Sequence, residues 1–271
     1  MLNQTPTLIG FCYDASSSFL RGPAQAPGVI RAALNSTAGN RWSEALIDLS
    51  LPQSLADAGD IALPETATFR DLITQATADL ISKNGRPVAL GGDHSVTYPI
   101  LRAVGPQYPQ LTILHFDAHP DLYDEFNGDR YSHACPFARI MEDRLATRLV
   151  QVGIRTMSAA QRIQVERYGV EVIDMRAWER GVRPKVGGPV YLSIDLDGFD
   201  PAFAPGVSHP ESGGLSARDV LSIIQQLPGP IVGADVVELN PSRDVNGLTA
   251  MLAAKLVKEI ASRMLETGSN Q

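Results

Sequence analysis

Short apolar runs alternate with amphipathic stretches along the 271 residues of this chain. Runs of apolar or β-branched residues predict eight strands, at residues 7–11, 45–49, 87–90, 111–116, 148–153, 170–173, 189–194 and 231–237. Several of these runs are continuous rather than alternating, which is typical of strands covered on both faces in a parallel sheet. Helical stretches fall between most of them.

Three helices are indicated most clearly, at residues 68–83, 216–227 and 248–265. The second opens with Ser216 and Asp219, which resemble a capping box with Asp in place of Glu. In the last, Ala and Leu recur at helical spacing, so we expect it to pack on the sheet or on a neighbouring subunit.

These elements predict an α/β protein, with a three-layer α/β/α fold around a mainly parallel eight-stranded sheet. One domain spanning residues 1–271 accounts for the whole chain. Residues 13–28 and 197–214 are rich in Gly and Pro and are expected to form loops beside strand ends. Ligands bind beyond the carboxyl ends of strands in such sheets, so both loops are candidates to shape a pocket.

Charge and cysteine content narrow the class of function. The formal charge of −7 argues against nucleic acid or anionic membrane as partners and favours a small cationic substrate. Cys12 and Cys135 lie far apart without CxxC spacing, so neither a disulfide framework nor a thiolate zinc site is indicated. The chain begins without a basic, apolar leader and holds no run long enough to span a membrane, so a cytoplasmic location is expected.

Clusters of Asp and His follow three of the predicted strands directly. They are residues 91–95 (GGDHS), residues 117–121 (DAHPD), and the pair Asp195 and Asp197. In an extended chain the i, i+2 spacing of the second and third clusters turns their side chains to one side. Any one such residue is more often a cap or a loop hydrogen-bonder than a metal ligand.

Together, however, the clusters point to bound metal, because burying several carboxylates without cations is costly. Four carboxylates and two neutral imidazoles would be balanced by two divalent ions. Oxygen and nitrogen donors without thiolate favour manganese, and iron or zinc less strongly. The predicted ligands are His94, Asp117, His119, Asp121, Asp195 and Asp197.

These segments resemble the signatures of the ureohydrolase family, which includes arginases and agmatinases. The signatures are residues 91–95, 117–121 and 193–201 (SIDLDGFDP), and Glu238 in residues 235–241 (DVVELNP) looks like the family's guanidinium-binding glutamate. The resemblance is strongest to plant-type arginases and covers nearly the whole chain. It is carried further by residues 17–27, 131–134, 137–142, 200–210 and 249–257. Plant members have an organelle-targeting extension that is not seen here, which favours a bacterial enzyme of the same branch.

The resemblance implies a fold of the arginase type and two Mn²⁺ ions per chain. One ion would be held by His94, Asp117, Asp121 and Asp195, and the other by His119, Asp117, Asp195 and Asp197. Asp117 and Asp195 would bridge the two ions. The family also implies a homo-oligomer, a trimer or a hexamer.

Catalytic roles follow from the same resemblance. A metal-bound hydroxide would attack the guanidinium carbon, and Asp121 would orient it and pass its proton to the leaving amine. Glu238 would pair with the guanidinium, and His133 would shuttle protons. A carboxylate suits a planar guanidinium, and a histidine exchanges protons near pH 7. Without the resemblance, His133 would more simply be a surface loop histidine.

The resemblance favours L-arginine as the substrate, giving ornithine and urea, and the alternatives are agmatine, giving putrescine and urea, or another guanidino acid. Tyr123 replaces the asparagine that contacts the substrate carboxylate in animal arginases, and Ser158 stands where an acidic partner for the amino group is expected. Two alternatives of other classes are a zinc deacetylase with a single-metal Asp-His-Asp site and a non-catalytic binding relative.

Four further residues could be mistaken for site residues. His115 is expected to be a hydrogen-bonded core histidine, Asp200 a turn or supporting residue, and Cys135 a buried or spectator thiol. For His209, a loop-packing role and a place at the substrate rim are both open.

Overall fold

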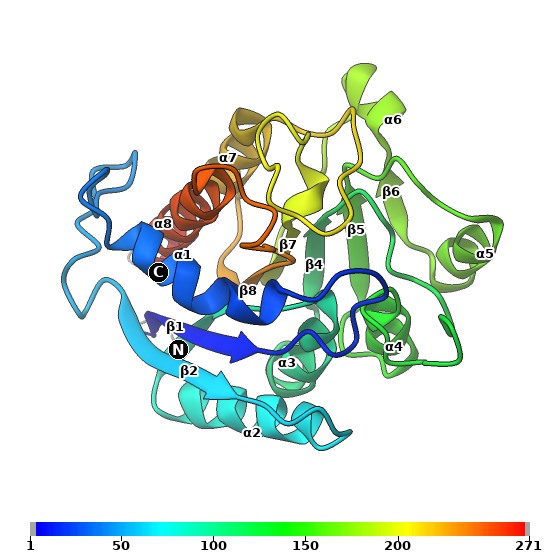
Figure 1. Ribbon diagram of the computed structural model, residues 1–271, viewed down its shortest axis with the longest axis horizontal. Coiled ribbons are helices and arrows are strands. Elements are labelled where there is room, and N and C mark those ends of the chain that lie inside the picture. Colours follow the sequence, from blue (N-terminus) through cyan, green and yellow to red (C-terminus); the bar gives the residue numbers. More distant parts are fainter. Residues whose placement is uncertain (1–3, 269–271) are drawn as a thin grey trace.

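One sheet of eight strands runs through the computed structural model, which describes residues 4–268 (Figure 1). The strands are β1 (Thr5–Cys12), β2 (Ala56–Ala62), β3 (Gly85–Leu90), β4 (Thr112–Phe116), β5 (Arg148–Val152), β6 (Glu171–Ile173), β7 (Val190–Asp195) and β8 (Ile231–Val237). Their order across the sheet is β2-β1-β3-β8-β7-β4-β5-β6, and every neighbouring pair is parallel. The predicted parallel sheet is confirmed.

Helices cover both faces of this sheet. The helices are α1 (Ala26–Leu34), α2 (Phe69–Ser82), α3 (Thr97–Val104), α4 (Pro136–Glu142), α5 (Ala159–Tyr168), α6 (Met175–Glu179), α7 (Ala217–Gln226) and α8 (Leu248–Gly268). One hydrophobic core joins the sheet to α1, α6, α7 and α8, and the other joins it to α2, α3, α4 and α5. In Figure 1, α1 lies beside α8, and α2 and α3 lie across the sheet from them. The predicted three-layer α/β/α fold is confirmed.

Burial on both faces explains why the inner strands read as continuous apolar runs. In β3, Val88 and Leu90 belong to the core under α1 and α8, whereas Ala89 belongs to the core under α2 and α3. All residues of β3, β4, β7 and β8 are buried. Successive side chains of a strand point to opposite faces, so both sets must be apolar.

The strand predicted at residues 45–49 is wrong, because the second strand is β2. Residues 45–49 lie in a turn held by the Leu49 N–H donating to the Arg41 carbonyl, and Leu46 has a left-handed φ of 61°. Within the described part of the chain, β2 (ADAGDIA) is an edge strand with β1 as its one neighbour, and most of its residues are exposed. An edge strand needs little apolar surface, so hydrophobicity did not reveal it.

The three helices expected most clearly are present. The second and third begin within one residue of their predicted starts, and α8 runs three residues past its predicted end. Before α7, Ser216 Oγ accepts from the Asp219 N–H, and the Asp219 carboxylate accepts from the Ser216 N–H, so the predicted capping box forms.

Candidate metal centre

The predicted ligand segments follow three strands in the middle of the sheet. Residues 91–94 follow β3, residues 117–121 follow β4, and Asp195 ends β7. Glu238 follows β8, which lies between β3 and β7. Because parallel strands end at the same edge, the four segments meet there, as expected for an open α/β sheet.

Four of these side chains form a first group around one nitrogen atom. The ligand atoms of His94, Asp117, Asp121 and Asp195 all lie within 4.8 Å of one another. His94 Nδ1 is 3.4 Å from Asp117 Oδ2, 3.0 Å from Asp121 Oδ2 and 3.2 Å from Asp195 Oδ2. All four residues are buried.

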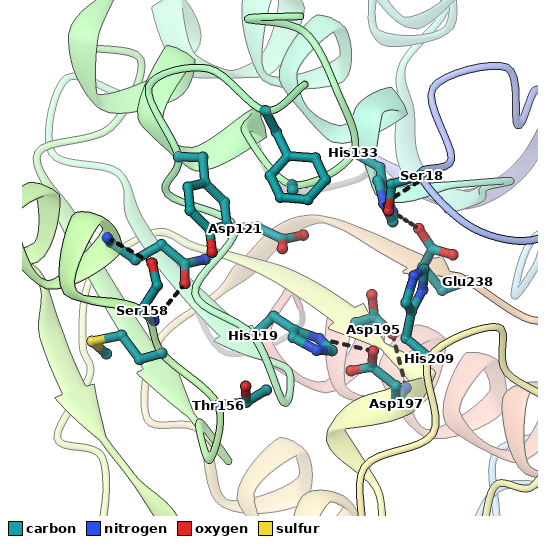
Figure 2. A pocket seen from close by; sticks show the side chains of 15 residues that line it. Ser18, His119, Asp121, His133, Thr156, Ser158, Asp195, Asp197, His209 and Glu238 are labelled. Carbon is teal, nitrogen blue, oxygen red and sulfur yellow. Dashed lines mark hydrogen bonds and ion pairs between the residues drawn. The ribbon is translucent and has the colours of Figure 1, made fainter. Parts of the chain in front are cut away.

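A second group shares Asp117 with the first. It consists of Asp117, His119 and Asp197, with His119 Nδ1 3.4 Å from Asp117 Oδ1 and 3.1 Å from Asp197 Oδ2. Figure 2 shows His119 pointing toward Asp195 and Asp197 at the floor of a pocket. The six predicted ligands therefore lie in two adjoining groups.

The geometry of His94 fits a metal ligand. Its Nε2 lies 3.0 Å from Ser193 Oγ, which donates to Asp235 Oδ1 at 2.7 Å. Its Nδ1 is buried against three carboxylates, and no group among the described residues forms a hydrogen bond with it. A ligating histidine is held in this way, with one nitrogen fixed by the protein and the other directed at the ion.

Charge supports the same conclusion. Burial raises the pKa of Asp195 well above its ordinary value, and repulsion from Asp197 and Asp117 raises it further. Burial and Asp117 raise the pKa of Asp197 to about 6, although His119 acts in the opposite direction. Buried carboxylates that repel one another in this way require compensating positive charge. The oxygen and imidazole donors of the two groups fit divalent cations.

Glu238 stands beside the cluster in a strained conformation. Its φ is 65°, and Asp121, with a φ of 49°, is also left-handed. Such backbones are costly for non-glycine residues and concentrate at functional sites. Glu238 Oε1 accepts hydrogen bonds from the His94 N–H and from His133 Nδ1, both at 2.9 Å. Among the described residues, none hydrogen-bonds Oε2.

His133 links Glu238 to the loop after β1. Its Nε2 lies 2.8 Å from Ser18 Oγ and accepts from the Ser18 N–H at 3.2 Å. Burial lowers the pKa of His133, but the Glu238 carboxylate more than offsets this effect, and the pKa is raised to about 9. His133 is thus buried between two protein partners rather than exposed on the surface.

A pocket of about 370 Å³ opens over the metal groups. Negative charge at its base comes from four acidic residues that are close together in Figure 2, Asp121, Asp195, Asp197 and Glu238.

Comparisons of sequence and of structure agree on the protein family that has such a site. A protein-family model described as "Arginase family" matches residues 4–262.

The chain belongs to the arginase family. It is 47% identical to "Arginase 1, mitochondrial" of Arabidopsis thaliana over 95% of this chain and 80% of that one. It also resembles the solved "Arginase from Medicago truncatula", with a TM-score of 0.91 and 44% identity over 97% of this chain and 88% of that one. The "Guanidinobutyrase" of Pseudomonas aeruginosa is 36% identical over 76% of this chain and 70% of that one.

Membership confirms the predicted resemblance to plant arginases and makes the chain an arginase-type ureohydrolase. Such an enzyme is a hydrolase that acts on C–N bonds of linear amidines and depends on a binuclear metal centre. The clustered His and Asp side chains fit that dependence.

The predicted cytoplasmic location is contradicted by the names of these arginase relatives. The relatives from Arabidopsis thaliana, Oryza sativa and Medicago truncatula are named mitochondrial, and a second Arabidopsis thaliana relative is named chloroplastic/mitochondrial. None of the helices between residues 4 and 268 combines the length and the apolar character needed to cross a bilayer.

The rim of the pocket carries this chain's departures from animal members of the arginase family. Tyr123 and Ser158 both line it, together with Phe126, Thr156 and Gln161. Ser158 Oγ accepts from the Gln161 N–H and so caps α5, and the Ser158 N–H donates in return to the Gln161 side chain. None of these five rim residues carries a charge.

The structure shows the positions of the four residues that could be mistaken for site residues. His115 is fully buried, with Nε2 2.8 Å from Asp117 Oδ2 and Nδ1 accepting from Gln151, as expected for a hydrogen-bonded core histidine. Asp200 accepts the N–H groups of its own loop, and Cys135 is buried. His209 lines the pocket wall, 5.3 Å from the His133 ring.

Two residues near the metal centre were not predicted from the sequence to belong to the site, Ser18 and Asp93. Asp93 is fully buried between Gly92 and His94, and its position inside the first signature was the available signal. Ser18 comes from the predicted pocket-shaping loop, but nothing in its local sequence distinguishes it from the two serines before it.

Proposed function

We propose that this chain is an arginase that holds two Mn²⁺ ions and hydrolyses L-arginine to L-ornithine and urea. The observation that carries the proposal is the pair of ligand groups joined by Asp117, beside a glutamate at the base of one pocket. When bound, two divalent ions supply Lewis acidity that makes a water nucleophilic near neutral pH.

The ligands proposed for the first ion are His94, Asp117, Asp121 and Asp195. Those proposed for the second are His119, Asp117, Asp195 and Asp197. The arrangement of His94 supports the first set, and the shared position of Asp117 supports a bridging role. Manganese is preferred because carboxylate oxygens outnumber imidazole nitrogens and no thiolate contributes.

The chain's own residues would bind the substrate and move its protons. Glu238 would orient the guanidinium through charge and hydrogen bonds, using Oε2, which has no hydrogen-bond partner among residues 4–268. Asp121 would accept a proton from the attacking water and pass it to the leaving amine. His133, which faces the pocket, would exchange protons with that amine and with solvent.

Arginine is preferred as substrate because of the 44–47% identity to plant proteins named arginases over nearly the whole chain. Agmatine is the second candidate. The uncharged rim favours it, because the rim residues Thr156, Ser158 and Gln161 offer no carboxylate to an α-ammonium group. Arginine would then be held there by hydroxyl and amide groups rather than by an ion pair.

Urea release from arginine, agmatine, 4-guanidinobutyrate and guanidine, each with added manganese, tests the proposal. Arginine should give the highest kcat/KM, and metal analysis should return two ions per chain. A higher kcat/KM on agmatine than on arginine would show that agmatine is the substrate. One zinc ion per chain, with amide hydrolysis and no urea release, would show that the protein is a deacetylase.

Two features of the whole molecule belong to this proposal. The chain is proposed to fold as one catalytic domain over residues 1–271 and to assemble as a trimer or hexamer. Light scattering after gel filtration would test the assembly, and a mass equal to one chain would overturn it.

A further inference from the structure

Ser18 reaches Nε2 of His133 from a loop that is distant in sequence. The loop joins β1 to α1, and His133 lies between β4 and α4. Ser18 presents two groups to Nε2, its hydroxyl at 2.8 Å and its backbone N–H at 3.2 Å. Figure 2 shows Ser18 directly against the His133 ring, on the side away from Glu238.

The loop is held in this position by buried contacts rather than by Ser18 itself. Asp93 Oδ2 accepts from the Ser16 N–H at 2.9 Å, and the Asp93 N–H donates to the Tyr13 carbonyl at 2.9 Å. The His133 N–H donates to the Ser16 carbonyl at 3.3 Å. Ser18 can therefore be changed without releasing the loop.

The two groups of Ser18 act differently on the two protonation states of His133. A backbone N–H only donates, so it stabilises the neutral ring, whose Nε2 carries a lone pair. A hydroxyl donates or accepts, so after rotation it also stabilises the charged ring, whose Nε2 carries a proton. In both states Nδ1–H remains directed at Glu238 Oε1. The hydroxyl thus allows Nε2 to gain and lose a proton without movement of the ring.

Other charges around His133 come from four neighbouring segments. Glu238 follows β8, Asp93 follows β3 and Asp121 follows β4, and these three carboxylates favour the protonated ring. His209, in the loop after β7, lies 5.3 Å away and disfavours that form when charged. Among residues 4–268, the hydroxyl of Ser18 is the acceptor that lies within hydrogen-bond distance of Nε2.

We infer that Ser18 is a positioning residue that holds His133 and sustains its protonated form through the hydroxyl group. Replacing Ser18 with Ala leaves the backbone N–H facing Nε2 and removes the acceptor for its proton. The pKa of His133 should then fall. The inference rests on the proposed function for the use of that proton, but the contact and its effect on the ring are independent of turnover.

NMR titration of protein labelled with ¹³C at histidine Cε1, prepared without manganese, tests the inference directly. The chain has five histidines, and an H133N variant assigns the relevant signal. In S18A the pKa of His133 should fall by about 0.5 to 1 unit, the effect of one lost hydrogen bond. S18T, which keeps the hydroxyl, should restore it.

Ser17 provides the matched control. Its hydroxyl lies 3.4 Å from Asp93 Oδ2 and does not contact His133, so S17A should leave the titration unchanged. An unchanged pKa in S18A, or an equal shift in S17A, would overturn the inference.

Kinetics of the manganese-loaded enzyme separate this inference from the proposed function. S18A should lower kcat several-fold, shift the pH profile of kcat in the same direction as the NMR titration, and change KM for arginine less than twofold. If the wild-type protein hydrolyses no guanidino compound, the proposed function fails, while the titration still decides the role of Ser18. A change in KM alone would show that Ser18 binds substrate rather than positions His133.

Discussion

Nδ1 of His133 lies 2.9 Å from Oε1 of Glu238, so the carboxylate proposed to receive the guanidinium already holds a partner within the protein. The same oxygen accepts the His94 N–H. Glu238 therefore connects a proposed metal ligand, a proposed proton carrier and the substrate position. His133 in turn lowers the pKa of Glu238 against the effect of burial, which keeps the carboxylate charged.

Replacing Glu238 with Gln should abolish most activity while leaving the metals bound. The substitution removes the charge that pairs with guanidinium but retains a group of similar size, and kcat/KM for arginine should fall roughly 10²- to 10³-fold. Metal content should stay at two ions per chain. Glu211 is exposed and carries no proposed role, so E211Q is the control. Substantial activity in E238Q would show that another group binds the guanidinium.

Variants of the two ligand groups should lose different numbers of ions. His119 belongs to one group, so H119A should retain one ion per chain, whereas Asp117 belongs to both, so D117N should retain none. Metal analysis after desalting measures the difference. Both variants should be inactive, because each lacks the binuclear centre. Two ions in H119A would mean that His119 is not a ligand.

Much of this centre could be predicted because its chemistry is local in sequence. Residues 117–121 place two carboxylates and a histidine at one strand end, and the parallel sheet brings Asp195 and His94 to the same edge. The contact between Ser18 and His133 could not be predicted in this way, since the two residues are 115 positions apart and only the folded loop joins them. β2 was missed for another reason, because its exposed edge position requires no apolar pattern.

The ion pair of His133 and Glu238 should make stability depend on pH. The pKa of His133 is about 9 in the folded protein, above the ordinary value near 6.5. The ion pair therefore contributes its full stabilisation of the fold below about pH 6.5, and this contribution is lost as pH rises through about 9. The free energy of unfolding should therefore fall between these limits, by roughly 3 kcal/mol at most.

Urea denaturation at closely spaced pH values measures this loss. E238Q removes the charge that raises the pKa, so its stability should change less over the same interval than that of the wild type. Equal pH dependence of the two proteins would show that the pair does not form. Both proteins should be compared at the same metal occupancy, because metal binding itself depends on pH.

Gly92 should be intolerant of even one added methyl group, because the loop after β1 crosses directly over it. A Cβ at this position would lie 1.7 Å from the Tyr13 carbonyl oxygen and 2.6 Å from the carbonyl carbon. In G92A the loop must retreat, which breaks the bond from the Asp93 N–H to Tyr13 and withdraws Ser18 from His133. We expect a loss of about 1–3 kcal/mol in stability and a larger loss of kcat than in S18A. Gly28 gives the matched control. It is exposed in α1, and a Cβ added there would meet no atom of residues 4–268 within 4 Å. G28A should therefore raise stability by about 0.5–1 kcal/mol. Thermal melts and urea release distinguish the two variants, and a G92A protein as stable and active as the wild type would show that the loop does not rest on Gly92.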